Sequence, residues 1–181
     1  MWSEALAGIQ KHLINSTRFL KLKFVAELPS GIGGPLAPKM DHLICFLPGC
    51  IALGATGGLT EAEAQRGPGW GAEQDQQMQL ARELMKTCWE MYKVTEIKLA
   101  PETAWFHVDD AALQPTPGAL PLSHSTNFIP AWKKDYIVEP LDSHNLQRPE
   151  TVESLFKMWR ITNDPIYRKW HKYRYSKITH G

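Results

Sequence analysis

The sequence predicts an all-α fold. Apolar residues recur at the three- and four-residue spacing of an amphipathic helix in three segments, residues 2–14, 74–94 and 150–162. A further helix is predicted to begin at Asp164-Pro165, because aspartate suits the N-cap and proline the first helical position. The segments between these helices carry the glycines, prolines and short alternating patterns of loops and strands. The predicted order is helix, extended loop, helix, extended loop.

The N-terminal part is predicted to be a helix followed by a short strand. Ser3 is the expected N-cap of the helix over residues 2–14, since its hydroxyl can accept a hydrogen bond from the first turn. Residues 21–27 alternate polar and apolar side chains, which predicts a half-buried strand. Prolines and glycines over residues 29–38 predict a loop after it.

The middle of the chain is predicted to hold two buried helices. Residues 40–53 are strongly apolar and predict a helix that is interrupted near Pro48-Gly49. A glycine-rich loop is expected over residues 54–71. The helix over residues 74–94 has the clearest pattern, with one apolar face opposite glutamine, arginine, glutamate and lysine.

The C-terminal part begins with an extended segment over residues 99–107, where Pro101 keeps the preceding backbone out of the helical region. Residues 109–142 are long, polar and proline-rich, which predicts a surface insertion or a loop that faces substrate. After the helix that starts at Asp164-Pro165, residues 171–181 form a basic, aromatic tail with no apolar period.

Composition excludes several classes of protein. Lys and Arg number 20 against 19 Asp and Glu, and the net charge of +1 indicates neither a nucleic acid nor a membrane surface as partner. The values of 43% hydrophobic and 22% charged residues are those of an ordinary globular chain. We see no apolar run as long as a spanning helix and no signal-peptide pattern at the start.

The three cysteines, Cys45, Cys50 and Cys88, form no CxxC pair, so a zinc or iron–sulfur site is not expected. A disulfide would require an oxidising compartment and would leave one thiol over. The tripeptide Asn15-Ser16-Thr17 is an N-glycosylation sequon, which has meaning only in the secretory pathway.

Three motifs place polar residues at the ends of predicted elements: KMDHL at 39–43, LAPE at 99–102 and RPETVES at 148–154. Glu150 and Glu153 share the first turn of the helix that follows Arg148-Pro149. Because the helix macrodipole stabilises acidic residues there, these two carboxylates alone could mark an ordinary helix start. A carboxylate in this position beside Arg148 is expected to stay ionised.

Read together, the three motifs resemble those of the class I α-1,2-mannosidases, glycoside hydrolase family 47. Strings before, between and after the motifs extend the resemblance over about residues 1–170: FVAEL, CFLPG, ALG, LMKTCWEMYK and SLFKMWRITNDPIYRKW. The resemblance implies part of an (α/α)₇ barrel of paired antiparallel helices with short β-hairpin loops. It implies inverting, Ca²⁺-dependent hydrolysis of terminal α-1,2-linked mannose on high-mannose N-glycans, in the endoplasmic reticulum or Golgi lumen.

The resemblance also implies roles for individual residues. Glu150 matches the general base, and Glu102 matches an acidic residue of the catalytic subsite. Glu102 and Glu153 would contact Ca²⁺ only through water molecules, which suits an ion that takes six to eight oxygen ligands. The remaining matches are the substrate-binding residues Asp41, His42 and Arg148, and the disulfide partners Cys45 and Cys88, which leave Cys50 unpaired.

The sequence departs from the family pattern in ways that limit what these residues alone could do. The family's general acid and its calcium-binding threonine match no residue here, Met1 aligns inside the barrel, and Gln147 replaces an apolar residue. We therefore expect residues 1–170 to be a partial catalytic domain, inactive by itself, and residues 171–181 to be a divergent tail. Any membrane anchor would lie outside the chain.

Two other interpretations stay open. The first is a non-catalytic protein that binds glycan or a partner, as in the lectin-like, degradation-enhancing branch of the same family. The second is a helical-repeat scaffold without a glycan site.

Overall fold

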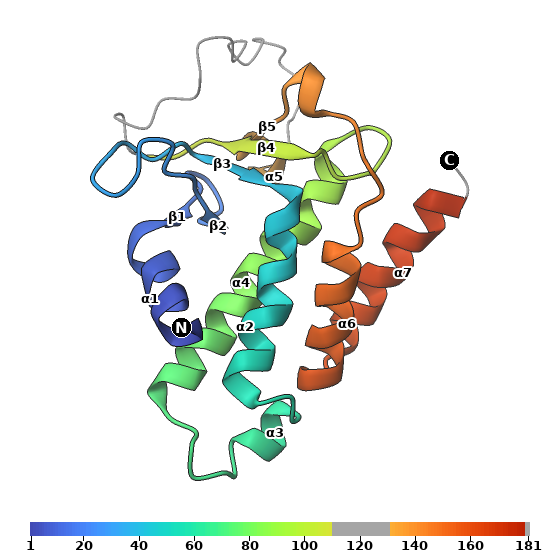
Figure 1. The fold of residues 1–181 in the computed structure, drawn as a ribbon. Coiled ribbons are helices and arrows are strands. Elements are labelled where there is room, and N and C mark those ends of the chain that lie inside the picture. The colour runs from blue at the N-terminus through green and yellow to red at the C-terminus, as the bar shows by residue number, and fades with distance from the viewer. Residues whose placement is uncertain (110–130, 180–181) are drawn as a thin grey trace.

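The computed structural model describes residues 1–109 and 131–179, and these form a mostly helical unit with two small sheets (Figure 1). The helices are α1 Trp2–His12, α2 Leu47–Thr56, α3 Glu61–Ala64, α4 Ala72–Val94, α5 Ala131–Lys134, α6 Glu150–Thr162 and α7 Pro165–Thr179. Two 3₁₀ helices are η1 His42–Phe46 and η2 Pro140–Asp142, and the strands are β1 Ile14–Ser16, β2 Lys23–Val25, β3 Lys39–Asp41, β4 Thr103–Phe106 and β5 Tyr136–Ile137. The all-α prediction was therefore too narrow.

Both sheets are antiparallel and lie toward one end of the helices (Figure 1). Strand β1 pairs with β2, and β3, β4 and β5 form a second sheet in that order. The two sheets share a core contact, because the rings of Phe24 in β2 and Phe106 in β4 stack with their centroids 4.2 Å apart.

Most predicted elements are present, with changes at their ends. Helix α1 and strand β2 confirm the predictions for residues 2–14 and 21–27. The Ser3 cap was wrong: Met1 is the N-cap, and the Ala5 N–H donates to the Met1 carbonyl at 3.0 Å. Asp164 does cap α7, since its carboxylate accepts the Ile166 N–H at 2.9 Å.

The helix predicted over residues 40–53 was wrong in its first half. Met40 belongs to β3, where it pairs with Ala104, and residues 42–46 form the 3₁₀ helix η1. Pro48 lies in the first turn of α2, where backbone N–H groups make no hydrogen bond within the helix, so the lack of an N–H in proline costs nothing there. The proline therefore helps begin this helix, whereas we had expected it to interrupt one.

The predicted loops contain more structure than their composition indicated. The loop expected over residues 54–71 includes α3, which Thr60 and Glu63 begin with a capping box. Within the stretch 109–142, residues 131–142 contain α5, β5 and η2, while residues 110–130 lie outside the described part. Helix α7 runs without a break across residue 171, the expected start of the tail, to Thr179.

Helix α2 lies between α4 and α6 and packs against both (Figure 1). Gly49 makes the approach of α6 possible, because a Cβ at this position would lie 3.0 Å from both Cα and Oγ of Ser154. The buried Ser154 hydroxyl accepts the Gly49 N–H at 3.1 Å and lies 2.6 Å from the Cys45 carbonyl oxygen. The start of α6 is thus held directly against η1 and α2.

One segment, His42–Ala64, is long and apolar enough by length and composition to cross a membrane, with a mean hydropathy of 1.7. We had expected no such run. The segment is not one continuous helix, because Gly57 and Gly58 adopt positive φ angles between α2 and α3. Ile51 and Ala52 are fully buried in the core, while 33% of the most apolar window of the segment is buried.

We expect Gly49→Ala to destabilise the chain and Gly8→Ala to stabilise it. The methyl group at position 49 would overlap Ser154 of α6 and should lower the free energy of unfolding by about 1–3 kcal/mol. Gly8, in the interior of α1, has no atom within 4 Å of the added Cβ, so alanine should add about 0.4–1 kcal/mol. Urea unfolding of both variants measures the difference, and equal effects would contradict the close approach of α2 and α6.

Candidate active site

The three motifs converge where the three-stranded sheet meets the helices. Asp41 is the last residue of β3, Glu102 directly precedes β4, and Glu150 is the first residue of α6. The His42 N–H donates to the Glu102 carbonyl at 2.8 Å, which joins the first two motifs. The third motif reaches Glu102 through Arg148, so residues far apart in the sequence build one site.

Glu102 forms hydrogen bonds to the whole segment that leads into α6. Its N–H donates to the carbonyls of Asp142 at 2.9 Å and His144 at 3.1 Å. Its carboxylate accepts the Leu146 N–H at 3.1 Å through Oε1 and the Arg148 Nε–H at 2.5 Å through Oε2. These bonds fix the direction in which Arg148 enters the site.

The Glu102 carboxyl is 13% exposed, and its pKa is set by opposing effects. Burial of the carboxyl raises the pKa. The hydrogen bonds from Arg148 and the Leu146 N–H lower the pKa, as do the charges of Arg148 and His42, and their combined effect is larger than that of burial. The resulting pKa lies below its ordinary value of 4.5. The hydrogen bond to Glu102 in turn raises the pKa of Arg148, so the pair is ionic at neutral pH.

The Gln147 backbone turns the chain just before Arg148. Its φ of 55° lies in the left-handed region, and its N–H donates to the Asn145 side chain at 2.8 Å. The Asn145 amide also donates to the Ala100 carbonyl at 2.7 Å. Asn145 thereby ties the turn to the residues before Glu102.

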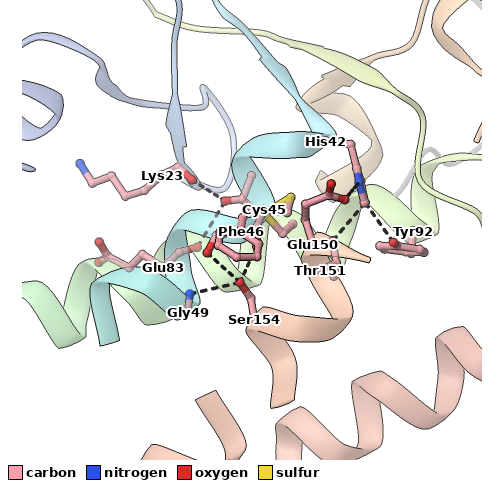
Figure 2. The surroundings of a disulfide bond; sticks show 12 residues. Lys23, His42, Cys45, Phe46, Gly49, Glu83, Tyr92, Glu150, Thr151 and Ser154 are labelled. Atoms are coloured by element: carbon pink, nitrogen blue, oxygen red, sulfur yellow. Dashed lines mark hydrogen bonds and ion pairs between the residues drawn. A yellow bond between two sulfur atoms is a disulfide. The ribbon is translucent and has the colours of Figure 1, made fainter. Parts of the chain in front are cut away.

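Glu150 lies beside a buried histidine (Figure 2). Its Oε2 is 3.6 Å from His42 Nδ1, and the two side chains are 13% and 1% exposed. The opposite ring nitrogen, Nε2, lies 3.0 Å from both the Tyr92 and the Thr151 hydroxyl oxygens. The two hydroxyl contacts hold the His42 ring in place, with Nδ1 toward the carboxylate.

The Glu150 Oε2 atom is buried, and it accepts no hydrogen bond from any residue in the described ranges. Glu150 is also at the N-terminus of α6, where the helix dipole favours a negative charge. The side chain as a whole is 13% exposed, and an ionised carboxylate can take a proton from a water molecule, which is the chemistry of a general base.

The predicted disulfide is present: Cys45 in η1 is bonded to Cys88 in α4. It lies close to the contact of Ser154 with η1 and α2, as Figure 2 shows, so α4 and α6 are both attached to η1. Cys50 is the free thiol and is half-buried in α2. Its burial raises its pKa, which the charge of Lys157 offsets only in part.

Two predicted site residues have other partners. Glu153 pairs with Lys157 one turn along α6, with Oε1 and Nζ 2.6 Å apart. In the described part of the chain, no hydrogen bond or ion pair joins Glu153 to Glu102 or Glu150. Asp41 accepts the Thr103 hydroxyl at 2.9 Å and lines an open hollow of about 550 Å³ that a ligand could enter.

The described residues do not fit direct coordination of a calcium ion. Across residues 1–109 and 131–179, no three His, Cys, Asp or Glu side chains are grouped to hold a metal. Both Glu102 oxygens already accept hydrogen bonds, and one Glu153 oxygen faces Lys157. The lone pairs that remain on these carboxylates can accept hydrogen bonds from water molecules around an ion.

Sequence reasoning did not identify two residues that shape the site, Tyr92 and Thr151. Tyr92 belongs to the apolar face of α4 and is fully buried, so its pattern was that of a core residue. Thr151 follows Glu150 in the third motif, and this position was the feature of the sequence that could have indicated a role in the site. That both hydroxyls meet one histidine nitrogen depends on packing between distant segments.

We expect Glu102→Gln to lower stability at neutral pH and to weaken the acid dependence of unfolding. Because the folded pKa of Glu102 lies below 4.5, its contribution is complete above that value and is lost as the pH falls through the folded pKa. The difference between wild type and variant in free energy of unfolding should therefore shrink on acidification. Urea unfolding at several pH values measures it, with exposed Glu96→Gln as the control. A difference that does not change with pH would refute the assignment.

The chain is similar in sequence to several proteins named as mannosidases. The Arabidopsis thaliana protein named mannosyl-oligosaccharide 1,2-alpha-mannosidase MNS3 is 44% identical, over 100% of this chain and 29% of its own length. A Candida albicans mannosyl-oligosaccharide 1,2-alpha-mannosidase is 44% identical over 93% of this chain and 26% of its own length. The human endoplasmic reticulum mannosyl-oligosaccharide 1,2-alpha-mannosidase is 40% identical over 92% of this chain and 19% of its own length. The chain thus spans less than a third of these relatives.

A solved structure of the alpha-1,2-mannosidase from Trichoderma reesei matches 93% of this chain and 30% of that chain, with a TM-score of 0.67 and 20% identity. That likeness shows a shared fold. The family model described as glycosyl hydrolase family 47 matches residues 1–180. This range includes most of residues 171–181, which we had expected to be a divergent tail. The chain belongs to glycosyl hydrolase family 47.

Proposed function

We propose that this chain supplies part of the active site of a mannosyl-oligosaccharide 1,2-α-mannosidase, which removes terminal α-1,2-linked mannose from high-mannose N-glycans. The observation that carries the proposal is the buried Glu150 carboxylate, with an unused oxygen beside His42 at the start of α6. The names of the relatives support the substrate. The (α/α)₇ barrel is proposed for the whole catalytic domain, of which these residues would form one part.

In the proposed reaction Glu150 is the general base. Inverting hydrolysis places a carboxylate and a carboxylic acid on opposite sides of the sugar, roughly 6.5–9.5 Å apart, so that a water molecule fits beside the carboxylate. Glu150 would take the proton of that water through its carboxylate, whose buried Oε2 faces the His42 ring that Tyr92 and Thr151 hold in place. The acid would come from residues outside those described.

Arg148, Glu102 and Asp41 would bind the sugar. Arg148 and Glu102 are held together by their ion pair and can offer donors and acceptors to sugar hydroxyl groups. We propose Ca²⁺ as the cofactor, bound to Glu102 and Glu153 through water molecules.

We place the protein in the lumen of the secretory pathway, the endoplasmic reticulum or the Golgi. The names of relatives from fission yeast, budding yeast and human include the endoplasmic reticulum. The Cys45–Cys88 disulfide supports an oxidising compartment. The partner would be a glycoprotein carrying a high-mannose glycan, and any membrane association would come from an anchor elsewhere in the polypeptide.

We expect Glu150→Gln, in the full-length polypeptide that contains this segment, to lower kcat by about 10²–10⁴-fold with little change in KM. Glutamine keeps the size of the side chain but cannot accept the proton. Release of mannose from a high-mannose oligosaccharide measures both constants. Glu96→Gln, an exposed glutamate in the turn after α4, is the control and should have wild-type kinetics.

Two results would contradict this proposal in different ways. Wild-type kcat in Glu150→Gln would remove Glu150 from catalysis. Glycan binding by wild-type protein that shows no mannose release under any condition would favour the non-catalytic, lectin-like function. Loss of that binding in Glu102→Gln would then assign the binding site to the same residues.

Removal of calcium should abolish mannose release by the full-length enzyme, and added Ca²⁺ should restore it. Glu153→Gln should raise the Ca²⁺ concentration needed for half-maximal activity, because one acceptor for the water molecules around the ion is lost. Titration of Ca²⁺ into chelator-treated enzyme measures both effects. Full activity in excess chelator would exclude the proposed cofactor.

A further inference from the structure

The sequon Asn15-Ser16-Thr17 coincides with β1, a strand that pairs with β2 alone among the described strands. Asn15 is half-buried at the middle of β1, and its Oδ1 accepts the Ser16 N–H at 2.6 Å. The Asn15 Nδ2 donates no hydrogen bond to any residue that the structure describes. Modification of this nitrogen would therefore break no described hydrogen bond of the fold.

Thr17, the third residue of the sequon, is buried and hydrogen-bonded, unlike the Asn15 nitrogen. Its side chain is 0% exposed, and its Oγ1 accepts the Leu22 N–H at 2.9 Å. The Thr17 N–H donates to the Leu22 carbonyl, also at 2.9 Å, so the hydroxyl lies inside the closed β1–β2 hairpin. An enzyme that must contact this hydroxyl cannot reach it in the folded chain.

The hairpin loop is held shut by a buried carboxylate from another part of the chain. Asp135 is fully buried and accepts the N–H groups of Phe19 at 2.8 Å and Leu20 at 2.9 Å. Asp135 follows α5, so these two hydrogen bonds can form only after the chain up to residue 135 has been made.

We propose that Asn15 carries an N-linked glycan, and that the glycan is transferred before the β1–β2 hairpin closes. The donor is an oligosaccharide attached to a lipid through pyrophosphate. Asn15 Nδ2 forms a bond to the anomeric carbon of the first sugar, the bond from that carbon to the pyrophosphate oxygen breaks, and the lipid pyrophosphate leaves with the electron pair. One Nδ2 proton passes to a base of the transferase.

The inference rests on the luminal location in the proposed function, and the Cys45–Cys88 disulfide supports that location independently of the sequon. A sequon alone is a frequent chance occurrence. The combination here is more specific: the acceptor nitrogen donates no hydrogen bond within the described ranges, whereas the recognition hydroxyl is buried and hydrogen-bonded in the hairpin.

Peptide mapping of the full-length protein from a eukaryotic host tests the modification. Trypsin should release residues 12–18, between Lys11 and Arg18, and enzymatic removal of N-glycans should convert a modified Asn15 to aspartate. We expect that conversion in wild type and in Ser16→Ala, which keeps the Asn-x-Thr pattern, and no glycan at this position in Asn15→Gln. The same digest shows whether Cys45 and Cys88 are bonded.

The outcomes separate this inference from the proposed function. An intact Cys45–Cys88 disulfide with unmodified Asn15 would overturn the glycan alone. Free Cys45 and Cys88 with unmodified Asn15 would overturn the luminal location and the glycan together.

The order of events is tested with a purified oligosaccharyltransferase and a lipid-linked oligosaccharide. A synthetic peptide of residues 12–18 should be modified, while folded full-length protein made without the transferase should not be. Equal modification of both would overturn the proposed order, because it would show that the Thr17 hydroxyl is reachable in the closed hairpin.

Discussion

The Glu102 hydrogen bonds are the constraint on which the site depends. One residue binds the start of η1 through its carbonyl, the end of η2 and His144 through its N–H, and the turn before α6 through its carboxylate. The partners are the backbone of His42 on one side and the side chain of Arg148 on the other. Because buried polar groups need partners, displacement of any of these segments would leave a charge or an N–H unsatisfied. The hydrogen bonds of Glu102 therefore both stabilise the folded chain and fix the position of Arg148.

A second constraint on Glu150 acts one turn further along α6. Gly49 permits the close approach of α2, Ser154 bonds to η1 and α2, and the disulfide attaches η1 to α4. α4 also supplies Tyr92, which holds the ring of His42 beside the carboxylate. The acidic first turn of α6 is thus fixed by contacts along the helix and ahead of it, and a base needs such a fixed position to meet its water molecule.

The parts of the fold that sequence reasoning predicted best are those determined by local periodicity. Helix α4 follows from its apolar face and α7 from the Asp164 cap, because both signals lie within a few residues. Strand β5 and the division of residues 39–56 into β3, η1 and α2 did not follow, since Met40 is as apolar as a helical residue would be. Its pairing with Ala104, more than sixty residues away, decided the conformation.

The sequence by itself determined which residues could act: an acidic turn at the start of a helix, two cysteines and a sequon, each recognisable from neighbouring residues. Only the tertiary structure decided what each contacts. Arg148 meets Glu102, Glu153 meets Lys157, and Thr17 is closed inside its hairpin. The physical reason is that helix starts and turns depend on short-range interactions, whereas burial and pairing of charges depend on which distant segments share the same space.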